Sequence, residues 1–330
     1  MNGSESKIEI FKPFGEAFEL MKKILFQPFD LKKWLVIGFA ALLASLSGGF
    51  NVPFNWSRRQ DNNSITESLR KVESLGQMEW WMIALIIVAA VIILMLVLVL
   101  MWIGARGRFI FNDCIVHNRA AIVAPWTEFR VEGNSFFLFS LLLLVLLIAL
   151  AVVGTLGLAI PLFIRGPGSR ADFGLLVAFC VFLFFVLCLV FSWLLISQLM
   201  VPIMYRQRCR APHAFAQTVR LIAGRPGPLV LYTLFFVVLV LAAAMMSCAA
   251  ACVTCCIAAI PYVGTVILLP IPVTLCAFSL LFLRQFGPDY DVWATFMPPE
   301  FLPILSEMPV LPPPTSSLNP PPEPPLSSGA

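Results

Sequence analysis

Hydrophobic residues in this chain gather into six long runs that contain no Asp, Glu, Lys or Arg. Uncharged runs of about 20 residues predict membrane-crossing helices, because at 1.5 Å per residue they match the hydrocarbon core of a bilayer. The pattern therefore predicts six transmembrane helices, over Trp34–Phe50, Trp80–Ile103, Phe136–Ile160, Phe173–Val201, Leu229–Ile260 and Val263–Leu283.

Two of these runs depart from the ideal length. The first has 17 residues and reaches about 25 Å, against a hydrocarbon core of roughly 30 Å, so whether it fully crosses the bilayer stays open. The fifth is longer than a bilayer needs and must tilt, kink or protrude. The stretch before the first run carries charges throughout and has no small-residue cleavage site, so we expect the first run to be retained.

An amphipathic segment precedes every second run. Its apolar residues recur at helical spacing, as do Phe11, Phe14, Phe18, Met21 and Leu25 in the first segment and Phe215, Val219 and Ile222 in the third. In the second segment the amphipathic pattern is clearest between Pro125 and Arg130, and the third segment runs from Pro212 to Gly224. Each of these three runs ends at a proline, Pro53, Pro161 or Pro261, which is a helix stop signal. We expect an all-α, polytopic fold of three pseudo-repeats, each preceded by a cytoplasmic interfacial helix.

Charge sets the expected orientation and domain plan. Sixteen of the 22 Lys and Arg residues fall in segments on one side of the six runs, which predicts that both termini are cytoplasmic. The net charge of +4 reflects this bias and indicates membrane lipid rather than nucleic acid as a partner. We expect a cytoplasmic segment over 1–33, a membrane domain over 34–283 and a disordered cytoplasmic tail over 284–330.

The tail differs from the rest of the chain in composition. Twelve of the 26 prolines lie between Pro298 and Pro325, where Lys and Arg are absent. Such a tail is either a solvated end or a polyproline segment that binds a protein partner. Self-association of the chain is a further candidate interaction.

A dense motif follows the second run, in the sequence RGRFIFNDCIVHNRAAIVAPWTEFRVEGNSFF from Arg106 to Phe137. This segment resembles a family of uncharacterised bacterial multi-pass membrane proteins with a loop of the form RGRF…VHNRA…PWxEFRxEGNS. The arrangement of runs is more loosely similar to the membrane portion associated with glycerophosphodiester phosphodiesterases, whose catalytic domain is not found here. The resemblance implies a bacterial inner-membrane protein and supplies no activity or cofactor.

Cysteines and histidines form two candidate clusters. Cys248, Cys252, Cys255 and Cys256 lie on one helical face near the outer surface, where they act as small packing residues, form disulfides or bind a metal. On the cytoplasmic side, the pairs Cys114 with His117 and Cys209 with His213 contain the right ligand types for a tetrahedral zinc site. The alternative is interfacial histidines beside reduced thiols.

Other polar residues suggest only contact with lipid. Arginines at predicted helix ends are candidates for binding lipid phosphate, namely Arg106, Arg108, Arg206, Arg208 and Arg210. Pro270 and Pro272 interrupt the sixth run, where freed carbonyls either coordinate a ligand or pack as a plain kink.

Function is constrained mainly by what the runs lack. They contain no Asp, Glu, Lys, Arg or His, which disfavours a proton-driven pump, and no catalytic motif is present. We therefore expect a non-enzymatic membrane scaffold or accessory protein without a cofactor. The alternative is a transporter or channel for a neutral or lipid-like substrate, which a water-accessible cavity between the repeats would favour.

Overall fold

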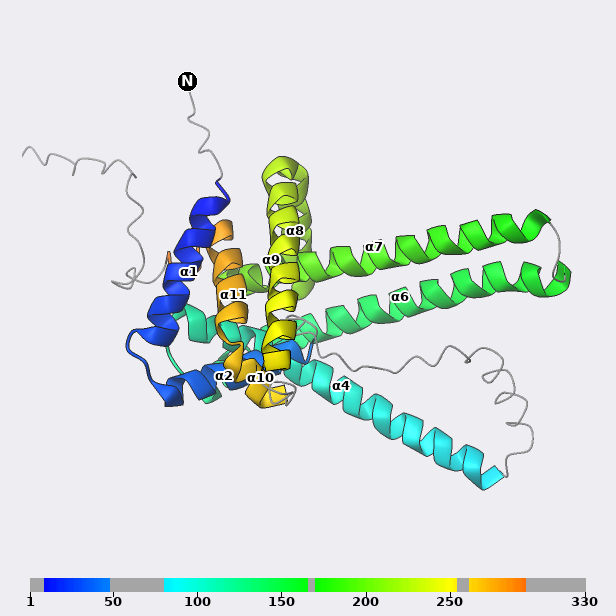
Figure 1. The fold of residues 1–330 in the computed structure, drawn as a ribbon, viewed down its shortest axis with the longest axis horizontal. Coiled ribbons are helices and arrows are strands. Elements are labelled where there is room, and N and C mark those ends of the chain that lie inside the picture. The colour runs from blue at the N-terminus through cyan, green and yellow to red at the C-terminus, as the bar shows by residue number, and fades with distance from the viewer. Residues whose placement is uncertain (1–8, 48–79, 166–169, 254–260, 295–330) are drawn as a thin grey trace, which may run out of the picture.

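The computed structural model describes residues 9–47, 80–165, 170–253 and 261–294. These residues form helices and no strand, which confirms the all-α class. Figure 1 labels the helices, which in chain order are α1 (Phe11–Phe26), α2 (Leu31–Ser45), α4 (Trp80–Val116), α5 (Val123–Glu128), α6 (Arg130–Arg165), α7 (Arg170–Gln207), α8 (Ala211–Gly224), α9 (Pro226–Val253), α10 (Pro261–Ile267) and α11 (Pro270–Arg284).

Four of the described helices, α4, α6, α7 and α9, are long and apolar enough to cross a membrane. Little of their most apolar windows is buried inside the chain. Apolar surfaces of this size are not stable in water and require a cover of lipid or protein. The structure is therefore that of a helical protein compatible with a membrane.

The first and sixth runs form shorter helices. α2 has 15 residues and reaches about 22 Å, less than a bilayer core. The sixth run is divided between α10 and α11, and the break confirms the predicted interruption at Pro270. A carbonyl near the break is satisfied within the protein, because the Nε1 of Trp34 donates to the oxygen of Val266 at 2.9 Å. This contact favours a kink that packs against a neighbouring helix over one whose carbonyls coordinate a ligand.

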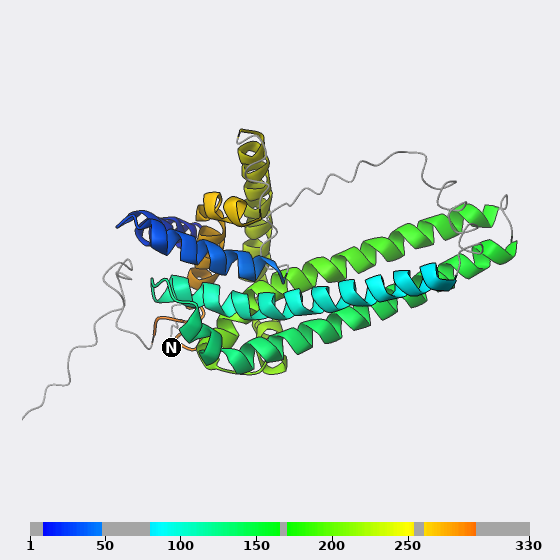
Figure 2. The ribbon, with the colours of Figure 1, turned by 90° about the horizontal axis from the view of Figure 1, so that it is seen from below.

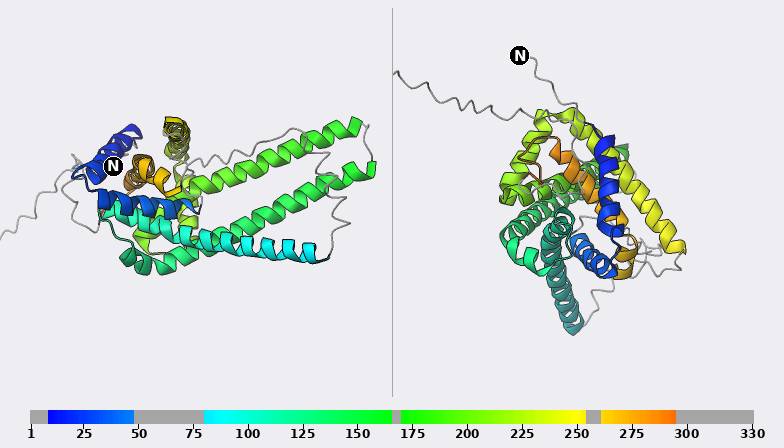
Figure 3. Two further views of the ribbon diagram at one scale, coloured as in Figure 1. Left: turned by 60° about the horizontal axis from the view of Figure 1, so that its bottom comes forward. Right: turned by 90° about the vertical axis from the view of Figure 1, so that its left-hand side faces the viewer.

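The long helices do not form one parallel bundle. α4, α6 and α7 project together from a common base, whereas α9 runs in a different direction (Figures 1 and 2). The two views in Figure 3 show α1, α2, α10 and α11 gathered at that base. Six membrane spans and the threefold repeat are therefore not seen in the described part of the chain.

Segments that the charge pattern assigns to one side of the membrane lie together at the base. Lys33 Nζ donates to Asn118 Oδ1 at 2.6 Å, and Gln207 Nε2 donates to the carbonyl of Asp289 at 3.3 Å. Trp293 is buried, and its Nε1 donates to the carbonyl of Val116 at 3.3 Å. Residues 285–294 therefore belong to the folded body rather than to the tail, whose proline-rich part lies outside the described residues.

The amphipathic segments form helices, with two corrections. α8 has nearly the predicted bounds, and the short α5 lies within the second segment. In α1, Met21 and Leu25 of the predicted face are buried together with Ala17, Leu20 and Ile24 where the helix packs on α11, whereas Phe11 and Phe18 are exposed. The helix stop predicted at Pro161 is wrong, because α6 continues to Arg165; Pro53 lies outside the described residues.

The core joins α9 to α11 through aromatic rings. Tyr232 is buried and stacks on Phe282 with the ring centroids 4.3 Å apart. Its hydroxyl lies 2.8 Å from the hydroxyl of Ser279, so its polar atom is satisfied inside the core. This packing fixes the start of α9 on α11, while the rest of α9 extends away from the base (Figure 2).

Candidate functional site

The site begins where α2 crosses the polar end of α4. A Cβ atom on Gly104 would clash with the backbone nitrogen of Ser47, and one on Gly107 would lie 2.6 Å from the carbonyl carbon of Leu43. Only glycine allows the two backbones to approach so closely. The close approach brings Ser47, just beyond the end of α2, against the side chain of Arg108.

Arg108 is held by that serine inside the protein. Its Nε donates to the hydroxyl of Ser47 at 2.7 Å, and its Nη2 donates to the carbonyl of the same residue at 3.1 Å. The guanidinium carbon lies 5.1 Å from the centre of the Phe136 ring. The residue is only 6% exposed, and its Nη1 has no hydrogen-bond partner in the described structure.

A cavity of about 540 Å³ lies beside Arg108, between α4, α6, α7 and α8. Its wall is almost wholly apolar along α6 and α7, with Leu143, Leu147 and Trp193 among the lining residues. Its polar lining includes Ser47, Arg108 and Ser140. We call this space the Arg108 cavity, and it combines an apolar volume with a buried positive charge.

Arg106, two residues earlier, is satisfied by other partners. Its guanidinium carbon lies 4.3 Å from the ring centre of Trp102 and 5.1 Å from that of Trp126. Its Nη2 donates to Asn134 Oδ1 at 2.9 Å, and the same oxygen accepts from the indole of Trp102 at 3.0 Å. These contacts join α4 to α5 and α6 through stacking and hydrogen bonds.

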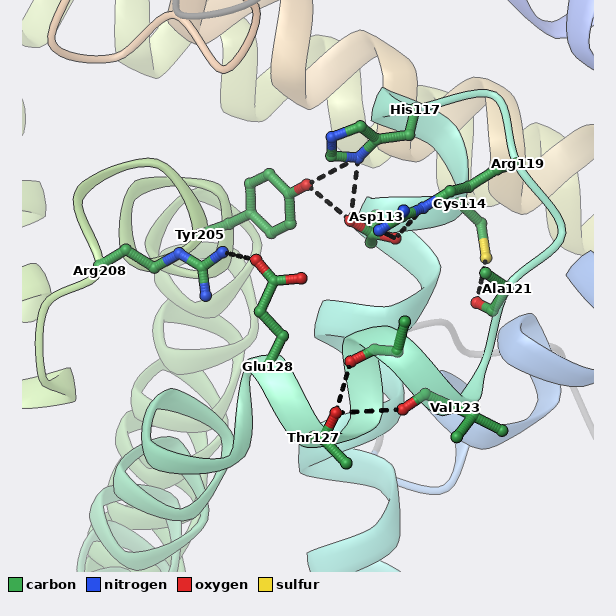
Figure 4. A network of polar contacts seen from close by, with 11 residues as sticks. Asp113, Cys114, His117, Arg119, Ala121, Val123, Thr127, Glu128, Tyr205 and Arg208 are labelled. Carbon is green, nitrogen blue, oxygen red and sulfur yellow. Dashed lines mark hydrogen bonds and ion pairs between the residues drawn. The ribbon is translucent and has the colours of Figure 1, made fainter.

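A second polar cluster closes the end of α4, as Figure 4 shows. The carboxylate of Asp113 accepts a hydrogen bond from the hydroxyl of Tyr205 at 3.0 Å and lies 2.9 Å from His117 Nδ1. Its other oxygen accepts from Arg119 at 3.0–3.1 Å. Asp113 is 1% exposed, so a buried acid joins α4, the following turn and α7.

Arg208 makes a third connection at the base. It pairs with Glu128 and lies 3.8 Å from Glu132, while its guanidinium carbon sits 3.9 Å from the ring centre of Phe129. The backbone φ of Arg208 is +51°, a left-handed conformation that helix ends often adopt but that favours glycine. The ion pair and the ring contact hold this residue in place after α7 ends.

The comparisons with known proteins give one match. A model described as a family of unknown function, DUF7544, matches residues 9–292 of the chain. The protein belongs to the DUF7544 family. No curated protein and no solved structure matches the chain.

The DUF7544 match spans every helix of the described structure, including the Arg108 cavity and the Asp113 cluster. It agrees with the resemblance to a family without an assigned activity that the segment after Arg106 indicated. It contains nothing on glycerophosphodiester phosphodiesterases, so that similarity stays an expectation.

The four zinc candidates of this DUF7544 protein have separate surroundings. The thiol of Cys114 is buried and donates to the carbonyl of Ala121 at 3.5 Å, while His117 contacts Asp113. His213 is exposed on α8, and burial raises the pKa of the Cys209 thiol, which disfavours the thiolate that zinc requires. Among the described residues no three metal-ligating side chains lie together.

The arginines expected at helix ends divide into two groups. Arg106 and Arg108 do not end a helix, because α4 continues to Val116, and both are buried. Arg208 is ion-paired, and Arg206 is half-buried in the last turn of α7. Arg210 is exposed at the start of α8, where contact with lipid phosphate stays a prediction.

The outer cysteines are only partly described in the DUF7544 structure. Cys248 and Cys252 are free thiols that face outward from α9, so they do not pack against another part of the described chain. Cys255 and Cys256 lie outside the described residues.

Ser47 and Ser140 were not identified from the sequence. Ser140 carries a signal that was available, because it is the single hydroxyl within the apolar stretch FFLFSLLLLVLL. Its position becomes informative only when the fold brings Arg108 to the same cavity.

Proposed function

We propose that this DUF7544 member is a non-enzymatic, multi-pass protein of the bacterial inner membrane that binds a lipid-like molecule in the Arg108 cavity. The observation that carries this proposal is the apolar cavity itself, with a volume of about 540 Å³ between helices that expose apolar surface. Cavities of a few hundred cubic ångströms lined by apolar side chains typically hold small molecules.

We prefer a carrier or transporter to the scaffold expected from the sequence because of this cavity, which is apolar rather than water-accessible. A scaffold needs no internal volume, whereas a carrier or transporter of lipid-like substrates needs an apolar site that is reached from the bilayer. Leu146 and Leu150 line the cavity and are also exposed on α6, so the cavity borders the surface that lipid would cover. Its apolar wall suits a hydrocarbon chain rather than a polar solute.

Six spans with cytoplasmic termini remain our proposed topology. It is supported by the bias of 16 of the 22 Lys and Arg residues and by the gathering of those segments at one base. Labelling of Asn62→Cys in intact cells with an impermeant thiol reagent should succeed. Efficient labelling of a cysteine placed in the tail, with none at position 62, would contradict this orientation.

Filling the cavity tests the proposed function. Leu143→Trp places a large ring in the cavity, whereas Leu142→Trp, one position away, adds the same ring on a side chain that is exposed and outside the cavity. After extensive washing in detergent, wild-type protein and Leu142→Trp should retain a co-purified lipid, and Leu143→Trp should retain about tenfold less. The measurement is mass spectrometry of lipid extracted from each purified protein.

The two tryptophan variants separate the proposal from its alternative. Equal lipid retention by both would mean that the lipid adheres to the outer surface and not in the cavity. Absence of retained lipid from all three proteins would return preference to the scaffold role.

A further inference from the structure

Arg108 is a buried cation without an anionic partner. It makes no ion pair in the part of the chain that the structure describes, and its two hydrogen bonds go to uncharged atoms of Ser47. Burial of an uncompensated charge is costly. The ring of Phe136 compensates only part of this cost.

The unpartnered donors of this region share one cavity. The edge of the guanidinium formed by Nε and Nη2 is occupied by Ser47, which leaves Nη1 without a partner. The hydroxyl of Ser140 on α6 is likewise buried and unpartnered. Both residues line the Arg108 cavity, but Nη1 and the Ser140 hydroxyl are themselves covered by neighbouring atoms, so each side chain must rotate to offer its donor to a ligand there.

The rest of the cavity lining is mostly apolar and indicates which part of a ligand would lie against it. Leu143, Leu147, Leu150 and Leu189 supply aliphatic surface, and the Trp193 ring lies among them. Among the residues that the structure describes, no second charged side chain lines the cavity. A ligand that satisfies both regions has one acidic group and one hydrocarbon chain.

We propose that the Arg108 cavity binds a single-chain lipid carboxylate, with its two oxygens accepting from Arg108 Nη1 and the Ser140 hydroxyl. This inference rests on the proposed function and names the class of its ligand. A carboxylate has one negative charge and two oxygens, which match one guanidinium and two free donors. A phosphate monoester carries close to two charges and three oxygens, which would leave an anionic oxygen unmatched.

Other arginines at the base do not meet these conditions. Arg106 is stacked and bonded to Asn134, and Arg208 is paired with Glu128. Arg130 and Arg210 border a surface hollow of about 400 Å³, but both side chains are exposed to solvent and carry no desolvated charge. The anion site is therefore assigned to Arg108 alone.

The test compares three probes that share one chain. Oleate, oleyl alcohol and oleoyl lysophosphatidate are bound to the full chain in nanodiscs of uncharged lipid, at alkaline pH where the carboxylate is ionised. Wild-type protein should bind oleate at least about tenfold more tightly than the alcohol, because a charge-assisted hydrogen bond is lost with the alcohol. In Arg108→Met, which keeps side-chain length without charge, the two affinities should become equal.

Ser140→Ala gives an independent readout that does not disturb folding, because the hydroxyl it removes has no partner in the described structure. We expect it to weaken oleate binding several-fold and to leave binding of the alcohol unchanged. This variant decides the question even where Arg108→Met fails to fold.

Each outcome separates this inference from the proposed function. Equal binding of oleate and alcohol by the wild type, abolished by Leu143→Trp, would overturn the carboxylate site and leave the lipid-binding function standing. Tighter binding of lysophosphatidate than of oleate would replace the carboxylate by a phosphate. Absence of binding by all three probes would overturn both proposals.

Discussion

Gly107→Ala should lower the free energy of unfolding by about 3 kcal/mol, the upper end of what overpacking usually costs. The new methyl group would lie 2.6–2.7 Å from backbone atoms of Leu43 and Ala44, and a backbone cannot rotate away as a side chain can. α2 must therefore move away from α4, which also withdraws Ser47 from Arg108. In detergent, the apparent melting temperature should fall by roughly 5–10 °C.

Gly157→Ala is the matched control, because nothing lies within 4 Å of a Cβ at that position of α6. Alanine favours helix over glycine by about 0.5–1 kcal/mol, so this variant should be neutral or slightly more stable. A Gly107→Ala protein that melts together with the wild type would show that α2 and α4 are not in close contact.

Asp113→Asn should cost about 2–4 kcal/mol of stability. The substitution keeps the shape of a side chain that is 1% exposed, but it removes the charge that Arg119 pairs with. It also turns one acceptor oxygen into an NH2 group that faces donors from Arg119 or Tyr205. Chemical unfolding in detergent measures the loss.

Tyr205→Phe is a milder test of the same cluster. It removes one hydroxyl donor and leaves the pair between Asp113 and Arg119 intact, so about 1 kcal/mol is expected. Since the two residues are in contact, the double variant should cost less than the two single changes together. Additive losses would indicate that the hydrogen bond between them is absent in solution.

Sequence patterns identified elements whose signals are local. The length of the uncharged runs is set by bilayer thickness, so α4, α6, α7 and α9 were each anticipated from composition alone. α8 was equally readable, because Pro212 and Gly224 mark its two ends.

Ending a predicted helix at the first charged residue is wrong where tertiary contacts compensate that charge. The second run was ended at Ile103 because Arg106 follows, yet α4 continues for another 13 residues. Arg106 is tolerated there because the rings of Trp102 and Trp126 and the amide of Asn134 surround it. Two of these three partners come from a later part of the chain, beyond the reach of a local pattern.

The zinc hypothesis, in contrast, overlooks a local contact that the sequence does indicate. Ligand types and similar spacing suggested that Cys114 and His117 act together, whereas His117 contacts Asp113, one helical turn earlier. That i, i+4 pairing was visible in the sequence. The contribution of Tyr205 was not, because it comes from α7.

The most direct test of the central claim is photo-cross-linking from inside the cavity in living cells. A benzophenone amino acid at Leu147, which lines the cavity, is compared with the same group at Leu142, which is exposed and lies outside it. Mass spectrometry then identifies the lipid attached at each position. We predict one class of single-chain lipid at Leu147 and ordinary bilayer phospholipid at Leu142. The same phospholipid mixture at both positions would contradict a lipid-binding cavity between α4, α6 and α7.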